Sequence, residues 1–135
     1  MGEGGDKMLS IINKRTRSEG GFTLIELLVV IIIIAILAAI AIPMYLSQRQ
    51  KGWESNAKSD LRNAAVAQES YFTDNDEYSG DTADLEVEGW NPSTDVTLTI
   101  EAADATSYCM QAVHNSGGDT WTFDSADGLT NGANC

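Results

Sequence analysis

The sequence has little positive charge. Its 135 residues include 8 lysines and arginines against 20 aspartates and glutamates, for a net charge of −12. The last basic residue is Arg62, and residues 63–135 hold 14 acidic residues and no basic one. Binding to a nucleic-acid backbone needs clustered lysine and arginine. We therefore expect no direct binding of nucleic acid.

The residues that most often carry enzyme chemistry are also scarce. There is one histidine, His114, and there are two cysteines, Cys109 and Cys135, without a Cys-x-x-Cys motif. No glycine-rich phosphate loop follows a predicted strand. Acidic pairs are frequent only because acids are numerous, and a solvated or structural role is predicted for His114. We expect no enzyme activity, no cofactor and no metal centre.

Apolar residues are plentiful but concentrated in one segment. Residues 22–46 are apolar at 22 of 25 positions, without a break from Leu27 to Ile42. As a helix, residues 22–42 would be about 31 Å long, close to the thickness of the hydrocarbon core of a membrane. A buried core helix would need a larger protein around it. A cleaved secretory signal would have a shorter run and a small-residue cleavage site after it, where this chain has Pro43. The pattern predicts a retained membrane span.

The orientation of this span does not follow from charge, because four basic residues precede it and four follow it. These are Lys7, Lys14, Arg15 and Arg17 before the span, and Arg49, Lys51, Lys58 and Arg62 after it. The short N-terminal part and the long acidic C-terminal part with both cysteines favour an N-terminus inside and an acidic domain outside.

One carboxylate, Glu26, interrupts the apolar segment. Near the bilayer centre an ionised carboxylate costs about 2.5–3.5 kcal/mol, so it is expected to have a partner. One interpretation places Glu26 in the first helical turn near the interface, where the helix dipole favours an acid. In the other, cleavage after Gly21 frees an amine on Phe22, four residues from Glu26, which neutralises the carboxylate of the same or another copy.

The run from Gly21 to Val30, Gly-Phe-Thr-Leu-Ile-Glu-Leu-Leu-Val-Val, followed by isoleucine-rich sequence and Pro43, closely resembles the type IV pilin family. The resemblance implies that a prepilin peptidase cleaves after Gly21 and that Phe22 becomes the N-methylated terminus. It implies that Glu26 is the assembly carboxylate. It also implies filaments with packed N-terminal helices inside and globular domains outside, built with an assembly ATPase and a platform protein. Gly20 stands where a basic residue is common in the family.

Three segments are therefore expected. Residues 1–21 form a leader peptide that is removed, and residues 22–46 form the hydrophobic transmembrane and polymerisation helix. Residues 47–135 form the helix continuation and a globular acidic head. At Pro43 a kink or local melting of the helix is expected, because proline removes a helix hydrogen bond. Gly52 is a second soft point.

Beyond Gly52 the chain has the pattern of an amphipathic helix that packs on a sheet. Its apolar stripe is Trp53, Ala57, Leu61 and Ala64, with Ala65 and Phe72 on the same side, and Glu54, Lys58, Asp60 and Arg62 on other faces. The helix is predicted to end at residues 74–76.

After the helix, residues 74–95 read as a solvated acidic loop, with a loose calcium site as the alternative. Strands are predicted at 96–100, 107–113 and 119–124, the last two joined by a hairpin turn at 115–118. The fold class expected is α+β, in which a long N-terminal helix packs its C-terminal half on an antiparallel sheet of three to four strands. This is the type IV pilin fold.

The two cysteines are expected to pair, because the domain is expected to be exported. A bond between Cys109 and Cys135 would stabilise by about 3.5 kcal/mol on the chain-entropy model. It would hold residues 128–135, which could hardly order themselves. This matches the C-terminal disulfide loop of many pilins.

The function expected is that of a structural subunit of a type IV pilus, supporting adhesion, twitching motility or DNA uptake. The subunit would wait as a single-pass prepilin in the cytoplasmic membrane, among lipids, and then join a homo-oligomeric surface filament. The alternatives are a pseudopilin or minor pilin of a type II secretion or competence system, and a membrane-tethered binding module. An electron-conducting filament is disfavoured because the ten aromatic residues show no regular helical spacing.

Overall fold

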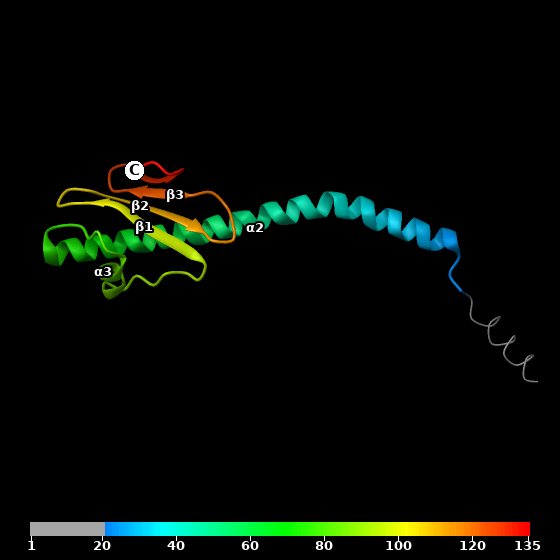
Figure 1. The fold of residues 1–135 in the computed structure, drawn as a ribbon, viewed down its shortest axis with the longest axis horizontal. Coiled ribbons are helices and arrows are strands. Elements are labelled where there is room, and N and C mark those ends of the chain that lie inside the picture. Colours follow the sequence, from blue (N-terminus) through cyan, green and yellow to red (C-terminus); the bar gives the residue numbers. More distant parts are fainter. Residues whose placement is uncertain (1–20) are drawn as a thin grey trace, which may run out of the picture. The chain divides into compact units, whose positions relative to one another are not determined.

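The computed structural model describes residues 21–135, so most of the expected leader peptide lies outside the described residues. The chain divides into two units, Met1–Ile42 and Pro43–Cys135. The elements are α2 (Leu24–Asn75), α3 (Thr82–Val87), β1 (Val96–Ala103), β2 (Tyr108–His114), β3 (Trp121–Asp124) and β4 (Gly128–Asn131) (Figure 1).

Helix α2 has 52 residues and continues through Pro43. Of the two outcomes expected at Pro43, local melting does not occur, because the helix is continuous there, and the kink stays a prediction. The helix ends at Asn75, as predicted. Asp76 follows in the left-handed region, with φ 58°, and its N–H donates to the carbonyl of Phe72 at 2.9 Å. This conformation satisfies a carbonyl in the last turn and stops the helix.

The strands form one antiparallel sheet in the order β1-β2-β3-β4. This confirms the expected α+β class, with four strands. In β1, half-buried residues such as Val96, Leu98 and Ile100 alternate with exposed ones, as the sequence pattern predicts. The strand runs three residues further than expected, past an irregularity between Ile100 and Ala102.

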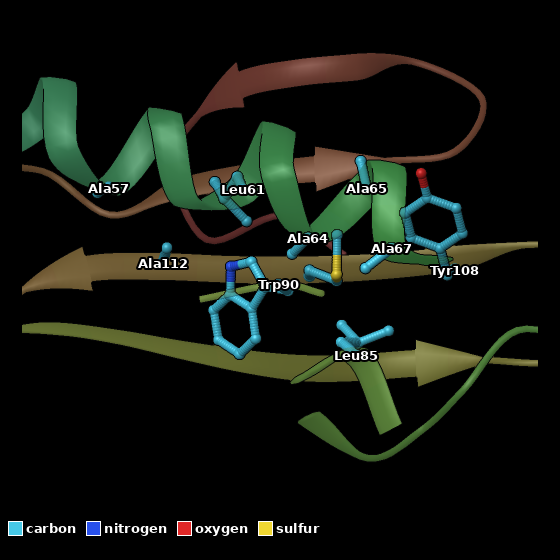
Figure 2. Packing of buried hydrophobic residues seen from close by; sticks show 10 residues of the cluster. Ala57, Leu61, Ala64, Ala65, Ala67, Leu85, Trp90, Tyr108 and Ala112 are labelled. Carbon is cyan, nitrogen blue, oxygen red and sulfur yellow. The ribbon is translucent and has the colours of Figure 1, made fainter. Parts of the chain in front are cut away.

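The core lies between the C-terminal part of α2 and the sheet (Figure 2). Ala57, Leu61 and Ala64 of the predicted stripe have no exposed surface, and Met110 of β2 faces the same cluster with none. The buried apolar residues are Ala57, Leu61, Ala64, Ala65, Ala67, Leu85, Trp90, Tyr108, Met110 and Ala112. The small alanines let the helix lie close to the sheet, so the second unit has a core of its own.

The expected loop at 74–95 is wrong in part, because it contains helix α3. The side chain of Asp81 accepts a hydrogen bond from the N–H of Ala83 at 2.9 Å and caps the helix. Leu85 then enters the core with no exposed surface. The short helix exists because a cap and one buried leucine hold it.

The turn between β2 and β3 packs against α2. Gly117 has φ 132°, and a side chain added there would meet the Trp53 ring at 3.3 Å. Next to it, the N–H of Asp119 donates to the Glu54 carboxylate at 3.4 Å. The glycine is needed for both its backbone conformation and the close approach of Trp53.

Candidate assembly site

The first part of α2 is apolar and uncovered. From Phe22 to Leu46 every residue is exposed except Ala38, which is half-exposed. The most apolar 18-residue window has a mean hydropathy of 3.3, and none of it is buried. By length and composition the helix can cross a membrane. An apolar helix of this length without a cover in its own chain needs lipid or other chains around it.

Glu26 lies at the start of this surface, in a capping box with Thr23. The N–H of Thr23 donates to Glu26 Oε2 at 3.1 Å, and the N–H of Glu26 donates to the Thr23 hydroxyl at 3.2 Å. Thr23 is the residue before the helix, so each side chain satisfies a backbone donor of the first turn. The geometry agrees with the first-turn interpretation of Glu26 and leaves its role in assembly as a prediction. The Thr-x-x-Glu spacing in the sequence is the pattern from which this cap can be predicted.

Phe22 and Glu26 line one apolar groove with Leu27 and Val30, about 460 Å³ in volume. Phe22 is 91% exposed, and residues 21–23 precede the helix without regular structure. The bond between Gly21 and Phe22 therefore lies in accessible, non-helical backbone, as a peptidase substrate requires. Cleavage at Gly21 and methylation of Phe22 stay predictions.

Just beyond the apolar segment, Arg49 lies between two aromatic rings. Its guanidinium carbon is 5.8 Å from the Tyr45 ring and 5.0 Å from the Trp53 ring. Trp53 in turn stacks on His114, with 5.6 Å between ring centroids. His114 is 7% exposed, and its Nδ1 accepts a hydrogen bond from the N–H of Ser116 at 3.1 Å. The histidine has the structural role that the sequence predicts, because it supports the turn and Trp53.

Two buried polar residues of α2 form hydrogen bonds with the segment of the chain that connects α2 to β1. Asp60, placed on another face by the sequence pattern, is 2% exposed. Its oxygens accept the N–H of Ser93 at 2.8 Å and the hydroxyl of Ser93 at 2.6 Å. Gln68 has no exposed surface and exchanges two hydrogen bonds with the backbone of Ser79, at 2.8 and 2.9 Å. The prediction that Asp60 lies away from the buried face of the helix is wrong. The residue can be buried because its hydrogen bonds to Ser93 offset the cost of removing the carboxylate from water.

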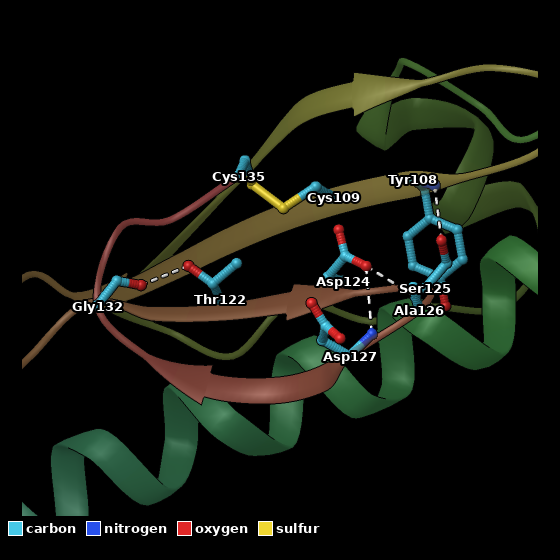
Figure 3. The surroundings of a disulfide bond; sticks show 9 residues. All are labelled: Tyr108, Cys109, Thr122, Asp124, Ser125, Ala126, Asp127, Gly132 and Cys135. Atoms are coloured by element: carbon cyan, nitrogen blue, oxygen red, sulfur yellow. Dashed lines mark hydrogen bonds between the residues drawn. A yellow bond between two sulfur atoms is a disulfide. The ribbon is translucent and has the colours of Figure 1, made fainter.

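Cys109 and Cys135 form a disulfide bond, with Cα atoms 5.7 Å apart (Figure 3). The expected pairing is confirmed. The tail that it holds is more ordered than expected, since Gly128–Asn131 forms strand β4 along β3. The Thr122 hydroxyl also donates to the carbonyl of Gly132. The disulfide therefore holds the chain end that follows the edge strand β4, and β4 itself also pairs with β3.

The acidic loop has no metal geometry in the part of the chain that the structure describes. Within residues 21–135, no group of three or more histidine, cysteine or acidic side chains could hold an ion. The calcium alternative depends on the spacing of Asp74, Asp76 and Asp81. Asp76 lies in the turn that ends α2, and Asp81 caps α3.

Four titratable groups of the head, Tyr71, Tyr78, Asp104 and Tyr108, have shifted pKa values, and the last two have the clearest structural causes. Burial, with added repulsion from Glu69, Tyr78 and Asp124, raises the pKa of Tyr108 to about 12. At Asp104, hydrogen bonds from the hydroxyl and N–H of Thr106 and from the N–H of Ser107 lower the pKa of the carboxyl. Both shifts arise from packing and turn geometry in the head, and neither group lies on the apolar helix.

Known families match both units of the chain. Residues 16–42 match the prokaryotic N-terminal methylation motif, and residues 43–124 match a family described as type IV minor pilin ComP, DNA uptake sequence receptor. Together with the exposed apolar helix and the four-stranded head, these matches define the class of the protein. The chain belongs to the type IV pilin family.

Individual relatives are similar over different lengths. The type IV wide pilus major component PilA4 of Thermus thermophilus is 45% identical over 106 residues, which cover 78% of this chain and 80% of that protein. The type IV major pilin protein PilA of Myxococcus xanthus is 46% identical over 71 residues, 53% of this chain and 31% of that one. The type II secretion system core protein G of Pseudomonas aeruginosa is 39% identical over 70 residues, 52% of this chain and 49% of that one.

Proposed function

We propose that this chain is a structural subunit of a type IV pilus, made as a prepilin and polymerised through residues 22–46. The observation that carries the proposal is the uncovered apolar surface, on which Ile33 is 51% exposed and Leu37 61%. Lipid covers this surface while the subunit waits in the cytoplasmic membrane as a single-pass protein. In the filament, the helices of other copies replace the lipid. An assembly ATPase and a platform protein drive the exchange.

In this proposal, cleavage after Gly21 leaves Phe22 as the methylated N-terminus and removes residues 1–21. The new amine is the partner of Glu26, in the same copy or in the next one along the filament. An amine and a carboxylate that meet in an apolar surrounding attract strongly, because water does not screen them. Residues 47–135 are then the displayed acidic head. Mass spectrometry of the mature protein is expected to find N-methyl-phenylalanine at Phe22, and an intact Met1 terminus would contradict the processing step.

The role of Glu26 is tested by comparing two variants that damage the same helix cap. Glu26→Ala removes one hydrogen bond of the capping box together with the carboxylate, whereas Thr23→Ala removes the other hydrogen bond and keeps the carboxylate. Glu26→Ala is expected to insert into the membrane and to form no filaments. Thr23→Ala is expected to form filaments, since loss of a cap costs only about 1 kcal/mol of helix stability.

The readouts are membrane fractionation for insertion and electron microscopy of sheared surface material for filaments. Abundant filaments of Glu26→Ala would overturn the assembly role of the carboxylate. Equal loss of filaments in both variants would mean that the cap matters and the charge does not.

A pseudopilin or minor pilin is the second candidate, favoured by the similarity to type II secretion core protein G. The two candidates differ in abundance. A major pilin makes up most of the sheared surface filaments, whereas a pseudopilin stays at the cell envelope. Quantitative mass spectrometry of sheared filaments separates the two candidates. Imaging of sheared material from a deletion strain shows whether the filaments are lost, and assays of that strain show whether adhesion, twitching or DNA uptake is lost with them.

A binding module tethered by the helix is the third candidate, and the match to a family described as a DNA uptake sequence receptor bears on it. The charge of this head opposes DNA as the ligand, because residues 63–135 carry no lysine or arginine. Gel-shift measurements with the mature chain are expected to show no retention of DNA at physiological salt. Retention that is lost on substitution of Arg49, Lys51, Lys58 and Arg62 would favour the receptor.

A further inference from the structure

The head exposes two large apolar side chains beyond Leu46, Val66 on α2 and Val87 at the end of α3. Val66 is 71% exposed and Val87 is 85% exposed. Every other exposed large apolar residue belongs to residues 22–46 within the described part of the chain. The core does not require either side chain to be apolar. Single exposed apolar residues are common on protein surfaces, so a contact with another molecule needs further features around each valine.

The two valines have neighbours of opposite charge. Arg62 lies one helical turn before Val66, is exposed, and is the last basic residue of the chain. Val87 stands between Glu86 and Glu88, and the last turn of α3 contains no basic residue. Glu88 is half-exposed and accepts a hydrogen bond from the Ser70 hydroxyl of α2, whereas Glu86 is exposed. An apolar centre with a cation and an apolar centre with an exposed carboxylate are complementary surfaces.

The surface around Val66 is hollowed. A groove of about 400 Å³ runs between α2 and the β2–β3 part of the sheet, lined by Arg62, Ala65, Val66, Glu69, Tyr108, Phe123 and Ser125. Most of its lining is apolar, and Arg62 is its one cation. Its one carboxylate, Glu69, accepts a hydrogen bond from the Tyr78 hydroxyl at 3.3 Å. We name it the Arg62 groove.

The segment around Val87 lies on the other side of an exposed ridge of α2 formed by Arg62, Asn63 and Val66. A second groove, lined by Val66, Ala67, Glu88 and Trp90 among others, separates the ridge from the end of α3. Figure 1 shows α3 and β3 on opposite sides of this part of the helix. Val66 lines both grooves, so the Arg62 groove and the Val87 tip are two different, neighbouring patches of one head.

We propose that the Glu86–Val87–Glu88 tip of one copy seats in the Arg62 groove of a neighbouring copy in the filament. Two different patches that complement each other form a heterologous contact, which repeats from copy to copy and builds an open helical array. Val87 covers Val66 and the apolar groove lining, and Arg62 pairs with Glu86. The acidic heads of neighbouring copies repel each other. The contact places Arg62 of one head against the acidic tip of the next and so reduces this repulsion. It rests on the proposed pilin function, since it needs filaments.

Charge reversal tests the ion pair. Arg62→Glu and Glu86→Lys each place like charges at the contact and are expected to lower the yield of sheared filaments about tenfold. The double variant R62E/E86K restores opposite charges and is expected to regain most of the yield. The mismatched double variant K51E/E86K is expected to stay low. All of the substituted side chains are exposed, and unchanged melting of each detergent-solubilised variant shows that the head still folds.

Crosslinking tests the contact of the valines without changing charge. Filaments are assembled from a mixture of two chains, one with Val66→Cys and one with Val87→Cys, and are then oxidised. A dimer on non-reducing gels is expected from the mixture and not from either chain alone. The matched control mixes Val87→Cys with Thr99→Cys, which lies on an exposed position of β1.

Rescue in R62E/E86K together with a dimer only in the Val66 mixture supports the contact. Absence of rescue, absence of the dimer, or an equal dimer with Thr99→Cys overturns it. If the unsubstituted chain forms no filaments at all, the proposed pilin function fails. If it forms filaments that none of these changes affects, the function stands and this contact does not.

Discussion

The two parts of helix α2 have the same secondary structure and opposite kinds of burial. In the first, Ile33 is 51% exposed although it is one of the most apolar residues; in the second, Leu61 has no exposed surface. The second part has alanines and Leu61 on the face that packs on the sheet and mainly polar residues on its other faces. The first part is apolar on every face because its partners lie outside the chain. One continuous helix is therefore specified by packing within the chain at one end and by packing against other molecules at the other.

The largest expected effect separates these two parts directly. Leu61→Ala is expected to destabilise the head by about 2–5 kcal/mol, since it leaves a cavity in a filled core. The matched change Ile33→Ala removes a similar side chain from the uncovered part and is expected to leave unfolding of the head unchanged. Chemical denaturation of the detergent-solubilised chain, followed by near-ultraviolet circular dichroism, measures both. A comparable loss of stability in the two variants would show that the apolar segment also contributes to the folding of the head.

The next effect concerns the edge of the head. Replacement of both Cys109 and Cys135 by serine is expected to cost about 2–4 kcal/mol of stability, because the bond no longer restricts the unfolded chain. Strand β4 keeps its backbone pairing with β3, so hydrogen exchange at Leu129 is expected to speed up without reaching the rate of an unfolded chain. Reduction of the unsubstituted protein serves as the control. Exchange at the unfolded rate would show that the disulfide alone orders the tail.

A smaller effect is expected at the buried carboxylate of α2. Asp60→Ala leaves the N–H and hydroxyl of Ser93 without their acceptor and is expected to cost about 1–3 kcal/mol. Its exposed neighbour offers a control, since Asn63→Ala is expected to change stability by about 0.5 kcal/mol or less. Thermal unfolding of the two variants makes the comparison. Equal stabilities would mean that the bonds to Ser93 contribute nothing.

The uncovered segment is where sequence reasoning reaches furthest. The unbroken apolar run, Glu26 within it and the residues from Gly21 onward predict the helix, its exposure and the family. The α2 stripe predicts the packing of Ala57, Leu61 and Ala64, because helical spacing directly reports which face is buried.

Sequence reasoning stops where a polar group is held by a distant partner. Asp60 looks like a surface residue until Ser93, 33 residues later, supplies two donors. Helix α3 depends on one cap and on Leu85, a signal too short to separate from a loop. Strand β4 is hidden in a glycine-rich tail, because the pairing with β3 that orders it is not a property of its own residues.

The last expected effect is confined to alkaline pH and again involves only the head. Burial is the main cause that raises the pKa of Tyr108 from 10.0 to about 12. The folded state therefore holds this proton between pH 10 and 12, where the unfolded state has lost it. The stability from this linkage is fully present below pH 10 and is lost as the pH rises through 12.

Tyr108→Phe keeps the ring and removes the titrating group. Its unfolding free energy is expected to fall less steeply than that of the unsubstituted chain as the pH rises from 10 to 12. Tyr45, which is 61% exposed and lies outside the core, supplies the control variant Tyr45→Phe, with a profile like that of the unsubstituted chain. If Tyr108→Phe has the same alkaline profile as the control, burial does not hold this proton. Since Tyr108 packs between the sheet and α2, that result would mean that the head opens to water more readily than the burial of its core implies.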